Sequence, residues 1–148
     1  MTTVLAPVEG DAVGLSAVPD PVFSAGMVGP GTAIDPLRGP GVAVAPIAGT
    51  IVKLHPHAYV IVGEDGKGVL VHLGVDTVQL KGRGFRLLAA EGERVAAGRP
   101  VVAWDSALVE AGGRSPLCAV VALDAAPGVV TAVAEGAVRA GDELFRWE

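Results

Sequence analysis

Hydrophobic and polar residues alternate in short runs along most of the chain, and glycine or proline separates one run from the next. The segment 57–62 alternates in this way, as does the run around His72, and residues 63–68 between them are typical of a turn. Successive side chains of a strand point to opposite faces of the sheet. The pattern therefore predicts a β-hairpin that carries His72 on its second strand.

Further short strands are expected on both sides of this hairpin. They are expected within residues 4–14, 32–35, 42–52, 84–88, 100–104, 117–123 and 128–147. The one helix candidate is 105–112, because Asp105 is a favourable N-cap and Gly112 a favourable stop. Residues 19–23 contain two prolines and are expected to form a loop or sheet edge that carries Phe23.

One internal repeat is visible in the second half of the chain. Residues 91–98 contain a Glu-Gly…Val…Gly pattern before the apolar run 101–104, and residues 135–141 contain a similar pattern before 143–147. Such repeats occur in compact β-folds that are built from two related halves. The sequence predicts an all-β fold: a compact antiparallel β-sandwich or barrel-like domain with an internal pseudo-repeat and at most short helical turns.

Composition supports this fold and excludes several partner classes. Hydrophobic residues make up 51% of the chain but aromatic residues only 4%, so valine, alanine, leucine and isoleucine must build the core. The 21 glycines and 11 prolines among 148 residues disfavour long helices. A net charge of −5 without a basic cluster disfavours nucleic acids and anionic membranes as partners.

Neither a signal peptide nor a membrane-spanning run of ~18 apolar residues is recognisable. The single cysteine, Cys118, excludes an internal disulfide and lies among apolar residues that are typical of a core. We therefore expect a cytoplasmic protein.

The two histidines of the predicted hairpin are the main candidates for chemistry. If Val62 pairs with Lys67, then His57 lies directly opposite His72, with Cβ atoms roughly 4.5–5.5 Å apart. Gly74 would share the face of His72 and leave space beside its ring. Two facing imidazoles are close enough to hold one small anion.

A neutral imidazole is a good nucleophile near neutral pH, and a second donor beside it stabilises the charge of a transferring phosphoryl group. The alternative for His72 alone is a core histidine whose nitrogens are satisfied by the backbone. Asp76 either orients an imidazole or begins a turn with Thr77. His55 is expected at the rim or surface.

Other chemistries find little support. Three histidines suggest zinc, but no cysteine or carboxylate stands at ligand spacing. No Ser-His-Asp set or nucleotide-binding fingerprint is present, and residues 81–84 lack the lysine placement of a P-loop. These residues are expected to form a solvated turn.

Several segments together resemble one protein family. Residues 71–85 are similar to the phosphorylation-site signature of the glucose-type enzyme IIA component of the bacterial phosphoenolpyruvate-dependent sugar phosphotransferase system. Residues 18–23 with 28–34 resemble its N-terminal signature, and residues 45–50 and 57–58 match two further segments. The resemblance covers nearly the whole chain and implies a single enzyme IIA domain over residues 1–148.

The resemblance implies that His72 accepts a phosphoryl group and that His57 stabilises it. The donor would be the histidine-containing phosphocarrier protein, and the acceptor the IIB domain of a sugar permease of the glucose or N-acetylglucosamine class. No cofactor or metal is implied. Unphosphorylated members also bind other transporters or enzymes as regulators.

The resemblance also implies an apolar partner-binding rim around the histidines. By position, this rim would consist of Phe23, Leu70, Leu73, Val75 and Asp76. Leu70 and Leu73 stand where the family frequently has aromatic residues, and His55 lies near the place of a supporting threonine.

Two other functions are weighed against phosphoryl transfer. A regulatory binding module with an inert His72 would bind partners without an acid-labile phosphate. A swinging-arm carrier of the biotinyl or lipoyl type is suggested by residues 49–52 and 91–98, but Lys53, Lys67 and Lys81 lack the setting of an attachment lysine.

Overall fold

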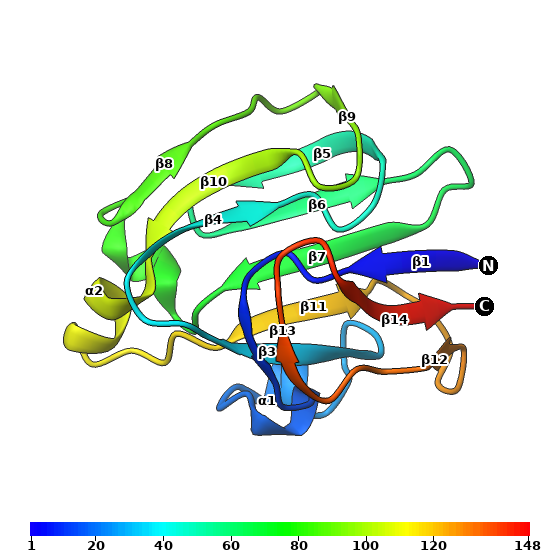
Figure 1. Ribbon diagram of the computed structural model, residues 1–148, viewed down its shortest axis with the longest axis horizontal. Coiled ribbons are helices and arrows are strands. Elements are labelled where there is room, and N and C mark those ends of the chain that lie inside the picture. The colour runs from blue at the N-terminus through cyan, green and yellow to red at the C-terminus, as the bar shows by residue number, and fades with distance from the viewer.

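The computed structural model describes residues 1–148, and antiparallel strands dominate it (Figure 1). The strands are β1 (Thr2–Leu5), β2 (Gly10–Ala12), β3 (Gly31–Pro36), β4 (Pro40–Val44), β5 (Gly49–His55), β6 (Ala58–Val62), β7 (Gly68–Leu73), β8 (Phe85–Leu87), β9 (Arg94–Val95), β10 (Pro100–Asp105), β11 (Cys118–Ala122), β12 (Val130–Thr131), β13 (Gly136–Val138) and β14 (Glu143–Trp147). The helices are α1 (Pro21–Ser24) and α2 (Ser106–Ala111), with 3-10 turns η1 (Leu15–Ala17) and η2 (Thr77–Leu80). The predicted all-β class is confirmed.

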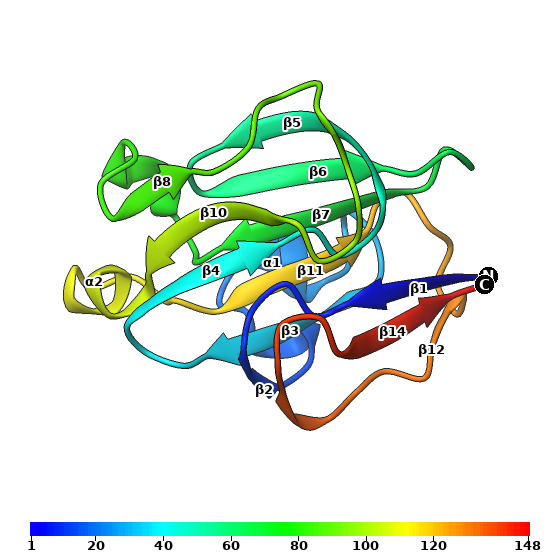
Figure 2. The same ribbon diagram turned by 45° about the horizontal axis from the view of Figure 1, so that its top comes forward.

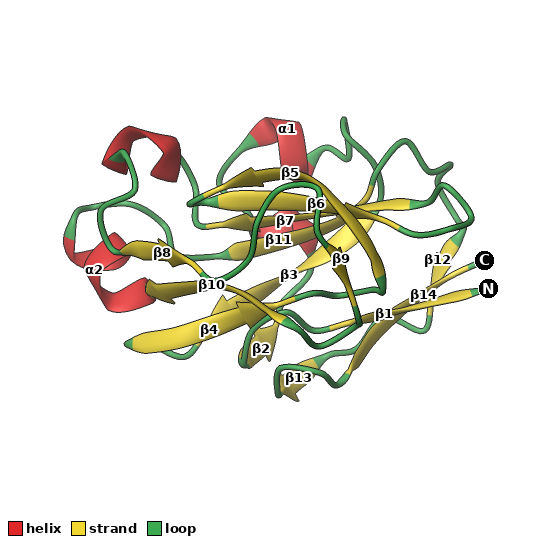
Figure 3. Cartoon of the chain, turned by 90° about the horizontal axis from the view of Figure 1, so that it is seen from above, coloured by secondary structure: helices red, strands yellow, loops and turns green.

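The strands form one large sheet and two small ones. The large sheet has the order β13-β2-β3-β11-β7-β6-β5-β9, and the small sheets have the orders β1-β14-β12 and β4-β10-β8 (Figure 2). Figure 3 shows the small sheets lying below the central strands of the large sheet. A hydrophobic core fills the space between the layers.

Alternation along the central strands decides which side chains enter this core. On β7, Val69, Val71 and Leu73 are fully buried in it, whereas Leu70 and His72 point to the other face and are half-buried. That outer face carries a second, smaller apolar cluster, to which α1 contributes Phe23. The large sheet therefore has apolar residues on both faces at its centre.

The internal repeat recurs in the hydrogen bonds of the backbone. The Gly98 N–H donates to the Ala45 carbonyl, and the Gly141 N–H donates to the Ala6 carbonyl, both over 2.8 Å. Each alanine N–H in turn donates to the residue after the corresponding glycine. The sheets β1-β14-β12 and β4-β10-β8 thus correspond to each other, and the predicted pseudo-repeat is confirmed.

Both short helices follow from local capping. The predicted helix after Asp105 is confirmed, because its carboxylate accepts the N–H groups of Ala107 and Leu108 at 3.0 and 3.4 Å. The prediction of a loop or sheet edge at 19–23 is wrong. Pro21 occupies the first helical position and the Asp20 carboxylate accepts the Val22 N–H, so a one-turn helix forms there.

No helix in the structure combines the length and apolar character needed to cross a bilayer.

Candidate functional site

The register of the histidine hairpin differs from the prediction by one residue. Val62 pairs with Gly68 rather than Lys67, so Ala58 rather than His57 lies directly opposite His72. The loop consists of residues 63–67 and is closed by the Gly63 N–H, which donates to the Lys67 carbonyl at 3.0 Å. It is one residue longer than expected, and this length shifts every pair of the two strands.

The two rings nevertheless meet. His57 does not belong to β6 but to the turn between β5 and β6, so strand alternation does not determine where its ring points. Its carbonyl accepts the Leu73 N–H at 2.7 Å, which fixes this turn against the end of β7. The centroids of the His57 and His72 rings are 5.3 Å apart, at an interplanar angle of 68°. The predicted juxtaposition of the two imidazoles is confirmed, by a different route.

The backbone fixes the tautomer of His72. Its Nδ1 lies 2.6 Å from the Gly74 carbonyl oxygen. A carbonyl can only accept, so Nδ1 carries the hydrogen and Nε2 keeps a free lone pair in the neutral ring. Burial lowers the pKa of His72, while the Gly74 carbonyl, Asp20 and Asp76 act in the opposite direction. The site favours a neutral ring with a nucleophilic Nε2.

Gly74 serves this bond in a way that the sequence did not indicate. The strand ends at Leu73, and Gly74 is buried with φ +82°. The expectation that it extends the strand and leaves space beside His72 is wrong, because a Cβ at Gly74 would lie 2.5 Å from Thr77 Cγ2. The left-handed turn instead directs the Gly74 carbonyl back toward His72.

His57 is also kept neutral. Burial lowers its pKa to about 4, and the nearby His72 and His55 rings lower it further in the same direction. His55 lies exposed at the end of β5, as expected, and stacks on His57 with centroids 5.6 Å apart and an interplanar angle of 22°. No group of three or more histidine, cysteine or acidic side chains is arranged to hold a metal ion.

Apolar side chains surround His72 on the outer face of the sheet. The Phe23 ring lies 5.2 Å from the His72 ring, centroid to centroid. Val75 belongs to the same small cluster as Phe23, and Leu70 packs against that cluster. Leu73 is different: it is fully buried in the core between the sheets, because it alternates with His72 along β7. Its assignment to the rim is therefore wrong.

Two carboxylates lie near His72, and only one of them was predicted. Asp76 is exposed, has φ +58° and precedes η2, so it begins a turn. Asp20, the N-cap of α1, was missed. Its position directly before Pro21 is the available sequence signal for a cap. Both carboxylates raise the pKa of His72.

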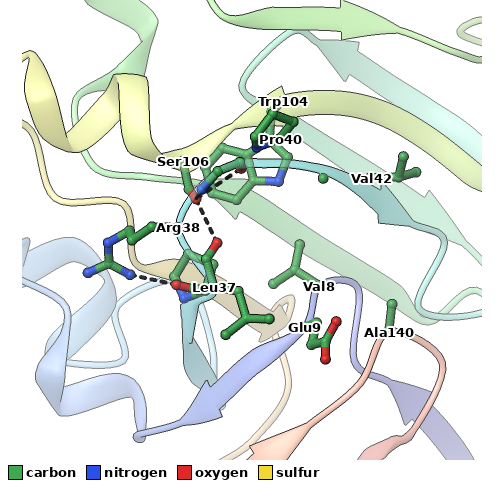
Figure 4. Close-up of a pocket in the computed structure, with 12 residues that line it drawn as sticks. Val8, Glu9, Leu37, Arg38, Pro40, Val42, Trp104, Ser106 and Ala140 are labelled. Atoms are coloured by element: carbon green, nitrogen blue, oxygen red, sulfur yellow. Dashed lines mark hydrogen bonds between the residues drawn. The ribbon is translucent and has the colours of Figure 1, made fainter.

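Two other candidate features lie apart from the histidines. A cleft of about 270 Å³ contains Trp104, Leu37 and Ser106, and the Ser106 hydroxyl donates to the Leu37 carbonyl at 2.8 Å (Figure 4). Lys67, which ends the hairpin loop, lies 5.4 Å from the centre of the Trp147 ring. It is therefore packed against the protein rather than presented as a free attachment lysine.

Comparisons with known proteins agree with the resemblance in the sequence. The model of one family, described as phosphoenolpyruvate-dependent sugar phosphotransferase system, EIIA 1, matches residues 2–127. The glucose-specific EIIA component of Bacillus cereus is 36% identical over 146 residues, which cover 97% of this chain and 88% of that protein. The N-acetylglucosamine-specific EIICBA component of Escherichia coli is 39% identical over 118 residues, 80% of this chain but 18% of that longer protein. The structure of glucose permease IIA from Mycoplasma capricolum superimposes with a TM-score of 0.87 at 31% identity, covering 97% of this chain and 94% of that chain.

Proposed function

Because the chain belongs to the EIIA 1 family of the phosphoenolpyruvate-dependent sugar phosphotransferase system, whose members are phosphoryl carriers, we propose that His72 is the residue that carries the phosphoryl group. The observation that supports this most strongly is the pair of rings. His72 presents an unprotonated Nε2, and a second imidazole lies 5.3 Å away, centroid to centroid.

The proposed transfer exchanges one nitrogen–phosphorus bond for another. Nε2 of His72 attacks the phosphorus of a phosphohistidine on the donor protein, the bond to the donor ring breaks, and that ring leaves with the electron pair. Throughout the step, Nδ1–H of His72 stays on the Gly74 carbonyl, so the His72 ring needs neither to gain nor to lose a proton. Onward transfer reverses these roles with the acceptor protein.

His57 is proposed to hold the transferred group. A phosphoryl group on Nε2 of His72 brings negative charge next to the His57 ring. This charge favours an N–H on the side of His57 that faces it, and raises the low pKa of His57. A donor that is already in place stabilises the charge of the transition state without rearrangement. The apolar residues around His72 limit the access of water to the phosphohistidine.

The partners follow from the family and its relatives. EIIA parts occur joined to B and C parts in relatives such as the Escherichia coli EIICBA component, which supports the IIB domain of a sugar permease as the acceptor. The donor is proposed to be the histidine-containing phosphocarrier protein, and the transfer to take place in the cytoplasm. The listed names of the relatives favour a permease of the glucose or N-acetylglucosamine class. Phe23, Leu70, Val75 and Asp76 are proposed as the surface that partners cover.

Phosphorylation of the intact protein tests the proposal. The chain is incubated with phosphoenolpyruvate, the first phosphotransferase enzyme and the phosphocarrier protein, and its intact mass is measured. We expect a gain of one acid-labile phosphate that is lost in His72→Ala. His57→Gln should still gain the phosphate but pass it to a IIB domain about a hundredfold more slowly. Absence of phosphate from the wild-type chain would instead favour a regulatory module with an inert His72.

A further inference from the structure

A hollow with a basic lining lies beside the histidine site. It has a volume of about 650 Å³ and is formed by residues from η2, from the segment after it and from the loop after α2. Its lining consists of Gln79, Leu80, Lys81, Gly82, Arg83 and Arg114. No acidic side chain contributes to this set, which is called the basic hollow below.

The positive charges of the basic hollow are not neutralised within the chain. Lys81, Arg83 and Arg114 take part in no ion pair, whereas four other arginines each contact a carboxylate. The Arg114 guanidinium donates to the Gln79 side-chain oxygen at 3.1 Å, and its Nε is buried without a partner. Three free cations thus meet at one place in a chain whose net charge is −5.

The basic hollow adjoins the site through two backbone segments. A Cβ on Gly82 would lie 3.6 Å from Pro56, which belongs to the turn that also contains His57. Arg114 precedes Ser115, whose carbonyl accepts the Val75 N–H at 2.9 Å. A protein that covers the histidines therefore extends over the basic hollow.

We propose that the basic hollow docks an acidic surface patch of the protein that exchanges the phosphoryl group with His72. This inference rests on the proposed function. Lys81 and Arg83 are exposed, so their charges are available to a partner surface. Unpaired charges of one sign around a docking site steer an oppositely charged partner and accelerate association.

Charge reversal with a matched control tests this proposal. Lys81→Glu/Arg83→Glu is compared with Arg139→Glu/Arg146→Glu, which changes the net charge equally but alters β14 and the segment before it, away from the basic hollow. The second-order rate constant is measured for transfer from the phosphorylated phosphocarrier protein to the chain, and from the phosphorylated chain to a IIB domain. We expect the first variant to be about tenfold slower than the control in at least one step at low ionic strength. Lys81→Gln/Arg83→Gln should lie between it and the wild type.

The dependence on salt provides the second readout. At about 1 M salt, where the Debye length is ~3 Å, the difference between the two charge-reversed variants should largely disappear. Equal rates of the two variants in both steps at low salt would overturn the proposal. Inorganic phosphate that binds the wild-type chain but not Lys81→Glu/Arg83→Glu, with unchanged transfer rates, would assign the hollow to a small anion and also overturn it. Failure of His72 to accept phosphate in any variant would contradict the proposed function instead.

Discussion

The two ring nitrogens of His72 have different environments, and this difference defines the proposed chemistry. The Gly74 carbonyl holds Nδ1–H, while Nε2 has no backbone partner and keeps its lone pair. His57 supplies a second ring whose low pKa keeps it uncharged until a negative group arrives. A nucleophile and a neighbouring donor are thus available without a metal ligand set in the site.

Removal of the His55 ring should raise the pKa of His57. Burial is the main cause of the low pKa of about 4, and repulsion from His72 and His55 adds to it. We therefore expect His55→Ala to move the pKa of His57 part of the way toward its ordinary value of 6.5, as measured by NMR titration of its ring protons. Lys53→Ala, on the same strand, should leave it unchanged. An unaltered pKa in His55→Ala would show that the stacked ring does not influence His57.

The sequence predicted the reactive residues of the site better than their supporting contacts. His72, His57 and Phe23 could be selected because their side chains are unusual in this composition, and the structure brings the three rings together. The contact with the Gly74 carbonyl could not be predicted, because it depends on a left-handed turn that ends β7. Asp20 was missed because the helix that it caps is only one turn long.

At the scale of the secondary structure, the site depends on how β7 begins and ends. The alternating pattern located β6 and β7, but it could not determine the register, because both a four-residue and a five-residue loop are common in hairpins. The longer loop moves Ala58 opposite His72, and the turn before β6 then delivers the His57 ring. The end of β7 at Leu73 allows Gly74 to turn its carbonyl toward His72.

Gly74→Ala tests the importance of this strand end. The added Cβ would lie 2.5 Å from Thr77 Cγ2 and 3.1 Å from the Ser115 carbonyl oxygen, in a residue with φ +82°. We expect the free energy of unfolding, measured in urea, to fall by roughly 1–3 kcal/mol more than in the control. Gly92→Ala is the control, because Gly92 has a similar φ of +90° but no atom within 4 Å of its Cβ position. Equal losses in the two variants would show that the close packing at Gly74 contributes nothing.

At the scale of the whole molecule, two related halves build a sheet that is asymmetric in its chemistry. β7 and β11 pair at the centre of the large sheet, and Ala119 lies directly opposite His72. The small alanine side chain leaves room for the imidazole on the outer face. All three histidines lie between residues 55 and 72, so only one half of the repeat carries the site.

The buried histidines should make the stability of the whole protein depend on pH. The pKa of His57 is about 4 in the folded chain and that of His72 is also lowered, whereas both are near 6.5 when unfolded. Between these values the unfolded chain binds more protons, so the free energy of unfolding should decrease as the pH falls from about 7 to about 5. Urea unfolding of the wild type and His57→Gln measures this. The variant should show a weaker dependence, and an identical dependence would contradict the assignment.

The central claim is that Nε2 of His72 carries the phosphoryl group while Nδ1 keeps its hydrogen. The most direct measurement is heteronuclear NMR of the phosphorylated, ¹⁵N-labelled protein, in which phosphorus–nitrogen coupling identifies the phosphorylated atom. The account predicts that the phosphorus couples to Nε2 of His72 and that Nδ1 remains protonated. Coupling to Nδ1 of His72, or to a nitrogen of His57 or His55, would contradict it.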